Sequence, residues 1–379
     1  MILLLACTSG DVGILPADPE LGELIRVVPS SGLPDQVEVQ ASANNLDVVE
    51  HAGETWFAFR TAPDHFASDQ THLYVLRSAD GGETWDLSLP IFMATDLREP
   101  RFLSFDGQLI LHWAVLGEDP LAFEPQGAMR AIFDGSEWSD PEWIFDDGFI
   151  PWRTRVMNGE PTMIGYTGGE GIYDQDGLPA LEVKWLTSDD GLDWDGEVIW
   201  TGGGSETDFA FTDEGDVVAV VRNEAGDAEG FGSLVCLGRA EAPTDWTCDH
   251  DPKKYDSPLV FEDDGRIWLI GRRNVTSDGR FDLDAEDLSH EEEFLNYSVA
   301  YWQEPKRCSL WEVIPERLEV EWVLDLPSKG DTCFPSILGS DGDFEVWNYT
   351  SDPEGPDVSW LDGQKGETWI TRQSLRFPR

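Results

Sequence analysis

"LVFEDDGRIWLIGRRN" (residues 259–274) shows the pattern from which the fold of this 379-residue chain is predicted. An apolar segment leads into an acidic turn that contains Gly265, and a second apolar segment follows the turn. Apolar runs on both sides of an Asp-Gly turn are typical of a β-hairpin. The stretch therefore predicts two antiparallel strands, and it gains its importance from how often the pattern recurs.

Five other segments repeat this template of apolar strand, glycine-containing turn and apolar or aromatic strand. They are residues 46–61, 101–114, 155–168, 209–223 and 336–351, with turn glycines Gly53, Gly107, Gly159, Gly215 and Gly342. Successive turn glycines lie 54, 52, 56, 50 and 77 residues apart along the chain. A second hairpin follows each first one, most clearly in residues 73–89, 182–200 and 233–248.

Two hairpins in each repeat supply four strands, and six repeats supply six sheets. A period of about 50 residues with four strands per unit is typical of a β-propeller. We therefore predict an all-β fold, a six-bladed β-propeller with four-stranded antiparallel blades, over residues 40–379. Residues 368–377 are expected to complete the last blade and to close the ring.

The longest gap between turn glycines contains an acidic, partly helical pattern at residues 282–302. We interpret residues 275–305 as an insertion on one face of the ring rather than as a seventh blade. Such an insertion often shapes the rim of a pocket. The alternative is a solvated acidic excursion without a function.

The chain begins "MILLLACTSGDVG", in which a short apolar run ends at Cys7. This pattern resembles a bacterial lipoprotein signal over residues 1–7, in which the cysteine becomes lipidated; a frayed apolar terminus is the alternative. Residues 8–39 are then a linker and lead-in to the propeller. We expect a protein of the bacterial cell envelope, either lipid-anchored or secreted.

The charge balance limits the possible partners. The chain has 25 basic and 75 acidic residues, a formal charge of -50. Such a surface repels nucleic acid and anionic membranes, so we expect no nucleic-acid partner and membrane attachment only through a lipid anchor. We expect a monomer.

Four cysteines remain once Cys7 is set aside, and an even number fits an oxidising compartment. Cys236 and Cys248 flank one predicted hairpin, so we expect a cross-strand disulfide between them. Cys308 and Cys333 then form the second pair. The sequence has no CxxC spacing and no His–Cys cluster, so we expect neither a metal site nor a cofactor.

Strand direction predicts which side chains meet. In a propeller, the start of each first strand and the end of each second strand lie on one face around the axis. These positions hold Asn45, Asp47, Arg98, Glu99, Arg101, Trp152, Arg153, Arg155, Glu206, Asp208, Asp256, Ser257, Asp331, Phe334, Arg60, His112, Tyr166, Arg222, Asn223, Glu224, Arg272, Arg273 and Tyr349. Arginine without lysine favours bidentate recognition of carboxylate or sulfate, although ion pairs with the many acids are the alternative.

Two short motifs add a resemblance. "SADGGETW" (78–85) matches the Asp box, S/T-x-D-x-G-x-T-W, and "TSDDGLDW" (187–194) is a second copy with Asp193 in the Thr position. With the predicted fold, they make residues 40–379 resemble the six-bladed sialidase superfamily. The resemblance implies that each box is a structural turn between third and fourth strands, away from the active site. A calcium loop is the rival interpretation, but further acidic ligands are missing.

Sialidases combine an arginine cluster, an aspartate acid/base and a tyrosine nucleophile activated by a glutamate. On this resemblance, Asp69 is the first candidate for the acid and Asp64 the second, with His65 nearby. Glu206 is the candidate glutamate. The candidate substrate-binding arginines are Arg60, Arg98, Arg101, Arg153, Arg222, Arg272 and Arg273.

Two positions depart from the sialidase pattern. Asn45 and Asp47 stand where the family has its first arginine, and Phe334 stands where it has the nucleophilic tyrosine. Tyr349, at the end of the following strand, is the remaining candidate for that role. In "DLREPRF" (96–102), Glu99 offers a different solution.

Glu99 or Asp47 would form a two-carboxylate pair with Asp69 or Glu206. A salt bridge that pins the strand start is the alternative for Glu99. The sequence therefore predicts an exported glycoside hydrolase of exo-α-sialidase-like type that acts on an acidic glycan. A non-catalytic glycan-binding lipoprotein and a polysaccharide lyase are the other hypotheses.

Overall fold

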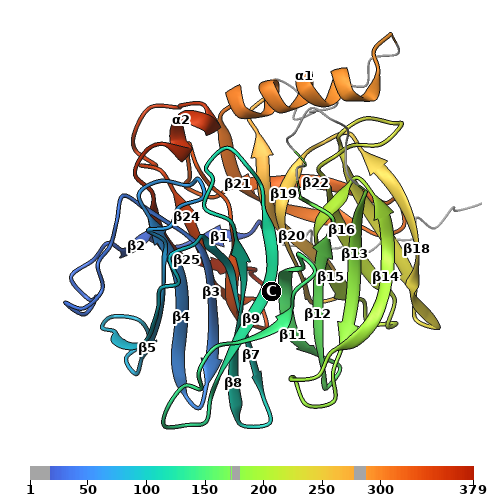
Figure 1. Cartoon of the computed structure of the whole chain (residues 1–379). Coiled ribbons are helices and arrows are strands. Elements are labelled where there is room, and N and C mark those ends of the chain that lie inside the picture. The colour runs from blue at the N-terminus through green and yellow to red at the C-terminus, as the bar shows by residue number, and fades with distance from the viewer. Residues whose placement is uncertain (1–17, 171, 173–179, 277–286) are drawn as a thin grey trace, which may run out of the picture.

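A computed structural model describes residues 18–170, 172, 180–276 and 287–379 of the chain. Six antiparallel sheets form a ring, five of four strands and a sixth of five (Figure 1). The predicted all-β, six-bladed propeller is therefore confirmed. Cys7 and residues 277–286 of the expected insertion lie outside the described residues.

The first three blades are consecutive in sequence. Blade one holds β3 (Ser42–His51), β4 (Glu54–Ala62), β5 (His72–Ser78) and β6 (Asp86–Ile91). Blade two holds β7 (Leu97–Phe105), β8 (Gln108–Leu116), β9 (Pro125–Phe133) and β10 (Glu142–Phe145). Blade three holds β11 (Ile150–Met157), β12 (Glu160–Thr167), β13 (Leu181–Thr187) and β14 (Asp195–Gly202).

The remaining blades continue the ring. Blade four holds β15 (Gly204–Phe211), β16 (Val217–Asn223), β17 (Ser233–Arg239) and β18 (Ala242–Asp251). Blade five holds β19 (Tyr255–Asp263), β20 (Arg266–Asn274), β21 (Lys306–Ile314) and β22 (Glu319–Asp325). Blade six holds β23 (Ser336–Ser340), β24 (Asp343–Thr350), β25 (Trp369–Arg376), β1 (Glu20–Leu21) and β2 (Ile25–Val28).

The hairpin at 259–274 illustrates why these residues form strands. Its turn residues Asp264 and Gly265 both have positive φ, 55° and 73°. A two-residue turn of this kind matches the twist of antiparallel strands, and Asp-Gly adopts it readily. The apolar runs on either side are buried because a neighbouring blade covers each face of the sheet.

The ring is closed by strands from both ends of the described chain. β1 and β2 pair antiparallel with β25, so that Ile25 lies opposite Arg372 and Val28 opposite Ile370. These residues were predicted to be a lead-in rather than strands, because β1 and β2 are short and have no hairpin partner nearby. Pairing between the two ends holds blade six against blade one.

The turn between β5 and β6 is a self-contained hydrogen-bonded unit. The Asp80 carboxylate accepts from the backbone N–H groups of Glu83 and Thr84, and the Ser78 hydroxyl accepts from Gly82 N–H at 2.8 Å. The Thr84 hydroxyl donates to Asp80 at 2.6 Å, and hydrogen bonds from Thr84 hold the pKa of Asp80 well below its ordinary value. These bonds occupy the polar groups of the turn.

The corresponding turn between β13 and β14 is displaced by one residue. Ser188 Oγ accepts from Gly191 N–H at 2.8 Å, and Asp190 accepts from the N–H groups of Leu192 and Asp193. The alignment of residues 187–194 to the box pattern instead places Thr187 and Asp189 at these positions. Consecutive Ser-Asp-Asp residues allow this shift, because short polar side chains bond the nearest free N–H groups.

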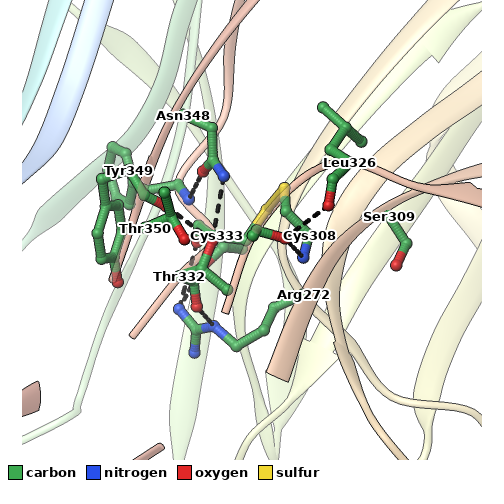
Figure 2. The surroundings of a disulfide bond; sticks show 12 residues. Arg272, Cys308, Ser309, Leu326, Thr332, Cys333, Asn348, Tyr349 and Thr350 are labelled. Carbon is green, nitrogen blue, oxygen red and sulfur yellow. Dashed lines mark hydrogen bonds between the residues drawn. A yellow bond between two sulfur atoms is a disulfide. The ribbon is translucent and has the colours of Figure 1, made fainter. Parts of the chain in front are cut away.

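Both predicted disulfides are confirmed. Cys236 and Cys248 are directly opposed on β17 and β18. Cys308, on β21, bonds Cys333 in the segment that enters blade six (Figure 2). Arg272 donates to the carbonyl groups of Thr332 and Cys333 from the other side, so the segment is held at two points.

Two helices lie at the same end of the ring, at the top of Figure 1. α1 (His290–Gln303) lies between β20 and β21, where the insertion was expected, and α2 (Trp360–Gln364) lies between β24 and β25. The helices adjoin, and Trp360 N–H donates to the Glu304 carbonyl at 3.2 Å. Within the described residues, no helix is long and apolar enough to cross a membrane.

We expect Trp85→Ala to lower the free energy of unfolding by about 3–5 kcal/mol, because this side chain fills the space between blades. Trp85 is 6% exposed and packs against Phe57 of blade one and Trp347 of blade six. Trp143→Ala, at a position that is 47% exposed on an outer strand, is the control and should cost about 1 kcal/mol or less. Chemical denaturation measures both values, and equal losses would contradict this account.

Candidate functional site

The strand ends predicted to meet around the axis enclose a cavity of about 530 Å³. All six blades contribute to its wall, and α1 and α2 cover part of its mouth. The polar part of the wall comprises Asn45, His65, Arg98, Glu99, Glu206, Arg222, Glu224, Ser257, Arg272, Gln364 and Lys365. Its aromatic part comprises Phe66, Phe123, Tyr166, Trp302, Phe334, Tyr349 and Trp360.

β-Bulges direct three polar residues into this cavity. Asn45, Glu99 and Ser257 sit at register shifts near the starts of β3, β7 and β19. All three have positive φ, between 38° and 56°, in the left-handed region that non-glycine residues rarely adopt. Backbone strain of this kind costs about 1–3 kcal/mol per residue and concentrates at functional sites.

Glu99 is a largely buried acid, with a side chain 13% exposed, and it has few compensating contacts. Its Oε2 lies 3.5 Å from Arg101 Nη2 and has no hydrogen-bond partner within the part of the chain that the structure describes. Burial raises the pKa of Glu99 to about 7; Arg101 opposes the shift, and the nearby Glu206 carboxylate contributes to it. A carboxyl group with this pKa carries a proton for much of the time at neutral pH.

Glu206 differs from Glu99 because both of its carboxylate oxygens have hydrogen-bond donors. Its Oε1 accepts from Arg222 Nη1 at 2.8 Å, and its Oε2 accepts from the Ser257 N–H at 2.8 Å. Both oxygens are therefore acceptors, and β15 presents the group to the same cavity as Glu99. The two carboxyl groups differ in environment although they share one cavity, an arrangement that separates acid and base roles.

A third group of polar side chains surrounds Asp331, which precedes β23. Its Oδ2 lies 2.7 Å from His65 Nδ1. Its Oδ1 accepts from the Tyr349 hydroxyl at 2.9 Å and from Trp360 Nε1 at 3.0 Å. His65 comes from the loop after β4, so this carboxylate ties blade one to both β24 and α2.

Three of the predicted arginines line the cavity. Arg98 donates to Asp96 at 2.5 Å and to the His65 carbonyl at 2.8 Å. The other two, Arg222 and Arg272, also donate to acceptors within the protein. Arg222 contacts Glu206, Glu224 and Asp256, and Arg272 bonds Tyr301, Ser257 and the carbonyls of Thr332 and Cys333.

The other four predicted arginines do not line the cavity. Arg60 is fully buried, where it bonds Asp96 and the loop carbonyls of Asp64 and Phe66. Arg101 and Arg153 lie on the axis against the ring of Phe334.

Arg273 follows Arg272 on β20, and adjacent strand residues point to opposite faces. Its guanidinium therefore reaches Asp325 on the far side of the sheet. Of two neighbouring candidates, only Arg272 faces the cavity.

The structure does not bring the expected acids Asp69 and Asp47 into the cavity wall. Asp69 is exposed on the loop after β4, while Asp64 in the same loop accepts from Phe66 N–H at 2.9 Å. Asp47 is buried and accepts from Phe102 N–H at 2.8 Å and from the Ser336 hydroxyl at 2.7 Å. Asp47 therefore links blades one, two and six, and its carboxylate accepts structural hydrogen bonds.

Sequence reasoning placed Asp331 on the axis without a role and missed Trp360 altogether. The hydrogen bonds of Asp331 depend on His65, which is 266 residues away in sequence. The only local signal was the Asp two residues before Cys333 at the entry to blade six. Across the described residues, no group of three or more His, Cys, Asp or Glu is arranged to hold a metal ion.

Comparisons with known proteins find a likeness in structure but none in sequence. No protein-family model matches the chain, and no curated protein matches its sequence. A sialidase from Trypanosoma rangeli superposes with a TM-score of 0.60 at 14% identity over 96% of this chain. The chain shares its fold with sialidases.

The match covers 60% of the length of the trypanosomal sialidase. An endosialidase from phage phi92 superposes with a TM-score of 0.58 at 10% identity, covering 94% of this chain and 69% of that one. An α-L-arabinofuranosidase from Fusarium graminearum has a TM-score of 0.53 at 10% identity, covering 94% of this chain and 98% of that one. At such identities the likeness concerns the fold, which is common to these glycosidases.

We expect Glu99→Gln to change how stability depends on pH. The pKa of Glu99 rises from 4.5 to about 7 on folding, so the wild-type protein loses stability relative to the variant as pH rises through this interval. The full difference is roughly 3 kcal/mol above pH 7 and vanishes below pH 4.5. Denaturation at pH 4, 6 and 8 measures it, with the exposed Glu83→Gln as control. A pH-independent difference would contradict the raised pKa.

Proposed function

We propose that this protein is a glycoside hydrolase whose active site is the axial cavity. The observation that carries the proposal is the carboxyl pair, in which Glu99 has a pKa of about 7 and Glu206 accepts hydrogen bonds at both oxygens. Most glycoside hydrolases use one carboxylic acid and one carboxylate on the two sides of the scissile bond. The fold shared with sialidases and an arabinofuranosidase supports the same reaction class.

Each carboxyl group has a role in the proposed reaction. Glu99 protonates the oxygen of the leaving sugar, because the proton it holds at neutral pH is available for transfer. Glu206 acts as the base for water or as the nucleophile, since Arg222 and the Ser257 N–H keep it oriented. Asp69 has no part in this scheme, and Asp47 is replaced by Glu99.

The proposed substrate is an acidic glycan. Arg98 lines the cavity. Its guanidinium Nε donates to Asp96, and its Nη2 donates to the His65 carbonyl. Its planar donor edge suits a sugar carboxylate. The trypanosomal sialidase has been solved in complex with sialic acid, and this ligand is a suitable first probe.

Tyr349 does not take the role of a sialidase nucleophile in this proposal. Its hydroxyl donates to Asp331, and burial raises the pKa of Tyr349 well above its ordinary value. A tyrosine with a raised pKa is a poor nucleophile, because the phenolate is what attacks. The proposed pair of Glu99 and Glu206 does not need a tyrosine nucleophile for hydrolysis.

The proposal includes export from the cytoplasm. Two disulfides support an extracellular or cell-envelope location, because such bonds persist in oxidising compartments. Lipidation at Cys7 is the proposed means of attachment, and mass spectrometry of the purified full chain would detect the lipid.

We expect Glu99→Gln and Glu206→Gln each to lower kcat about 1,000-fold or more, because each removes one half of the acid–base pair. Release of reducing sugar from sialosides and uronic-acid glycans measures the rate. Glu83→Gln, on an exposed turn, is the matched control and should retain full activity. Normal rates in either cavity variant would overturn the assignment.

The same assay separates the two other hypotheses. A product that absorbs in the ultraviolet as an unsaturated uronate would identify a polysaccharide lyase. Binding on a glycan array without turnover would identify a glycan-binding module.

We expect Tyr349→Phe to lower kcat less than about 10-fold, because the hydroxyl orients Asp331 and does not attack the sugar. In an enzyme with a tyrosine nucleophile, the same change removes the covalent step. Rates on a 4-methylumbelliferyl sialoside and a 4-methylumbelliferyl glucuronide measure the difference. A loss comparable to that of Glu206→Gln would favour the tyrosine mechanism.

A further inference from the structure

His65 is a cavity residue that the proposed acid–base pair does not use. It is anchored by its backbone as well as its ring, since its N–H donates to the Gln364 carbonyl at 3.0 Å and its carbonyl accepts from Arg98. Its Nδ1 lies 2.7 Å from Asp331 Oδ2. The ring is therefore fixed in position on one side of the cavity.

Asp331 determines which nitrogen of His65 carries the proton. The carboxylate is fully buried and also accepts from Tyr349 and Trp360. An ionised carboxylate has no proton to donate, so the Nδ1 atom that faces it must be the N–H. The lone pair of the neutral ring is then on Nε2.

The Nε2 edge of the ring is the part that faces the cavity. The His65 side chain lines the cavity and retains 13% of its exposure, although its Nδ1 edge meets a buried carboxylate. Nε2 has no hydrogen-bond partner among residues 18–170, 172, 180–276 and 287–379. Burial lowers the pKa of His65, which favours the neutral ring and keeps this acceptor available.

We propose that His65 Nε2 recognises a hydroxyl group of the bound sugar by accepting its hydrogen bond, with Asp331 as the residue that fixes the required tautomer. Arg98 stands beside His65, so the cavity presents a cationic donor next to a neutral acceptor. This combination suits an acidic sugar whose carboxylate and a hydroxyl group lie close together. The inference deepens the proposed function and rests on it.

The two alternative roles of His65 differ in what they require of Nε2. A purely structural histidine needs only the bonds through Nδ1 and its backbone. Recognition of a hydroxyl group also needs an unprotonated Nε2 that is open to the ligand. Experiments that alter Nε2 while preserving Nδ1 therefore distinguish the roles.

The first experiment reads the tautomer directly in the free protein. Long-range ¹⁵N–¹H correlation spectra of histidine-labelled protein, with His65→Asn to assign the signal, should show a protonated Nδ1 and an unprotonated Nε2. Asp331→Asn should change this pattern, because an amide can donate to Nδ1. A proton on Nε2 in the wild-type protein would overturn the proposal whether or not the protein is a hydrolase.

The second experiment adds N-acetylneuraminic acid and D-glucuronic acid as probes. We expect the His65 Nε2 signal to shift on binding, and His65→Asn to weaken binding about 10- to 100-fold while thermal stability is kept. Asn can still donate to Asp331 from the Nδ1 position but has no group at Nε2. His72→Asn is the control, because His72 bonds Tyr74 away from the cavity.

The outcomes separate the two levels of the proposal. Binding that leaves Nε2 unshifted, or that survives His65→Asn unchanged, would overturn the role of His65 and leave the hydrolase proposal intact. Binding of neither sugar would overturn recognition of these acidic sugars by His65. Loss of activity in Glu99→Gln with normal binding would still support hydrolysis.

Discussion

Closure of the ring is the constraint on which the rest of this structure depends. No single blade forms the cavity wall, because side chains from all six blades line it. β25 pairs with β24 on one side and with β1 and β2 on the other, so strands from both ends of the chain share the last sheet. Separation of these strands would open the ring and remove the site without changing any residue that lines it.

Buried carboxylates hold the blades together around the axis. Asp47 accepts from the backbone of blade two and from Ser336 of blade six, and Asp208 accepts from the Val260 N–H of blade five at 2.7 Å. A buried carboxylate that lacked such donors would be costly, so each of these groups specifies one arrangement of its neighbours. Glu99 differs from Asp47 and Asp208, because its Oε2 has no hydrogen-bond donor among the described residues.

The site has features that oppose stability and suit chemistry. Glu99 combines positive φ, burial and a raised pKa, three costs that the surrounding packing must offset. Nearly every arginine on this face donates to a carboxylate or a carbonyl group, and these bonds keep the cavity wall rigid. A rigid wall suits the proposed hydrolysis, because catalytic groups must be oriented before the substrate binds.

The repeat, the blade count, both disulfides and the face on which strand ends meet were predictable from the sequence, because periodicity and turn chemistry are local properties. The sequence also placed Glu99, Glu206, Arg98, Arg222, Arg272 and Tyr349 at strand ends that line one cavity. The contacts that each group makes there depend on the folded arrangement of the blades. Protonation and pairing depend on neighbours hundreds of residues away, as with His65 and Asp331. They also depend on a bulge that turns Glu99 into the cavity, and on strand alternation that turns Arg273 away from it while Arg272 faces it. Protonation states and hydrogen-bond partners depend on burial and on distances in space, which the spacing of residues along the sequence does not specify.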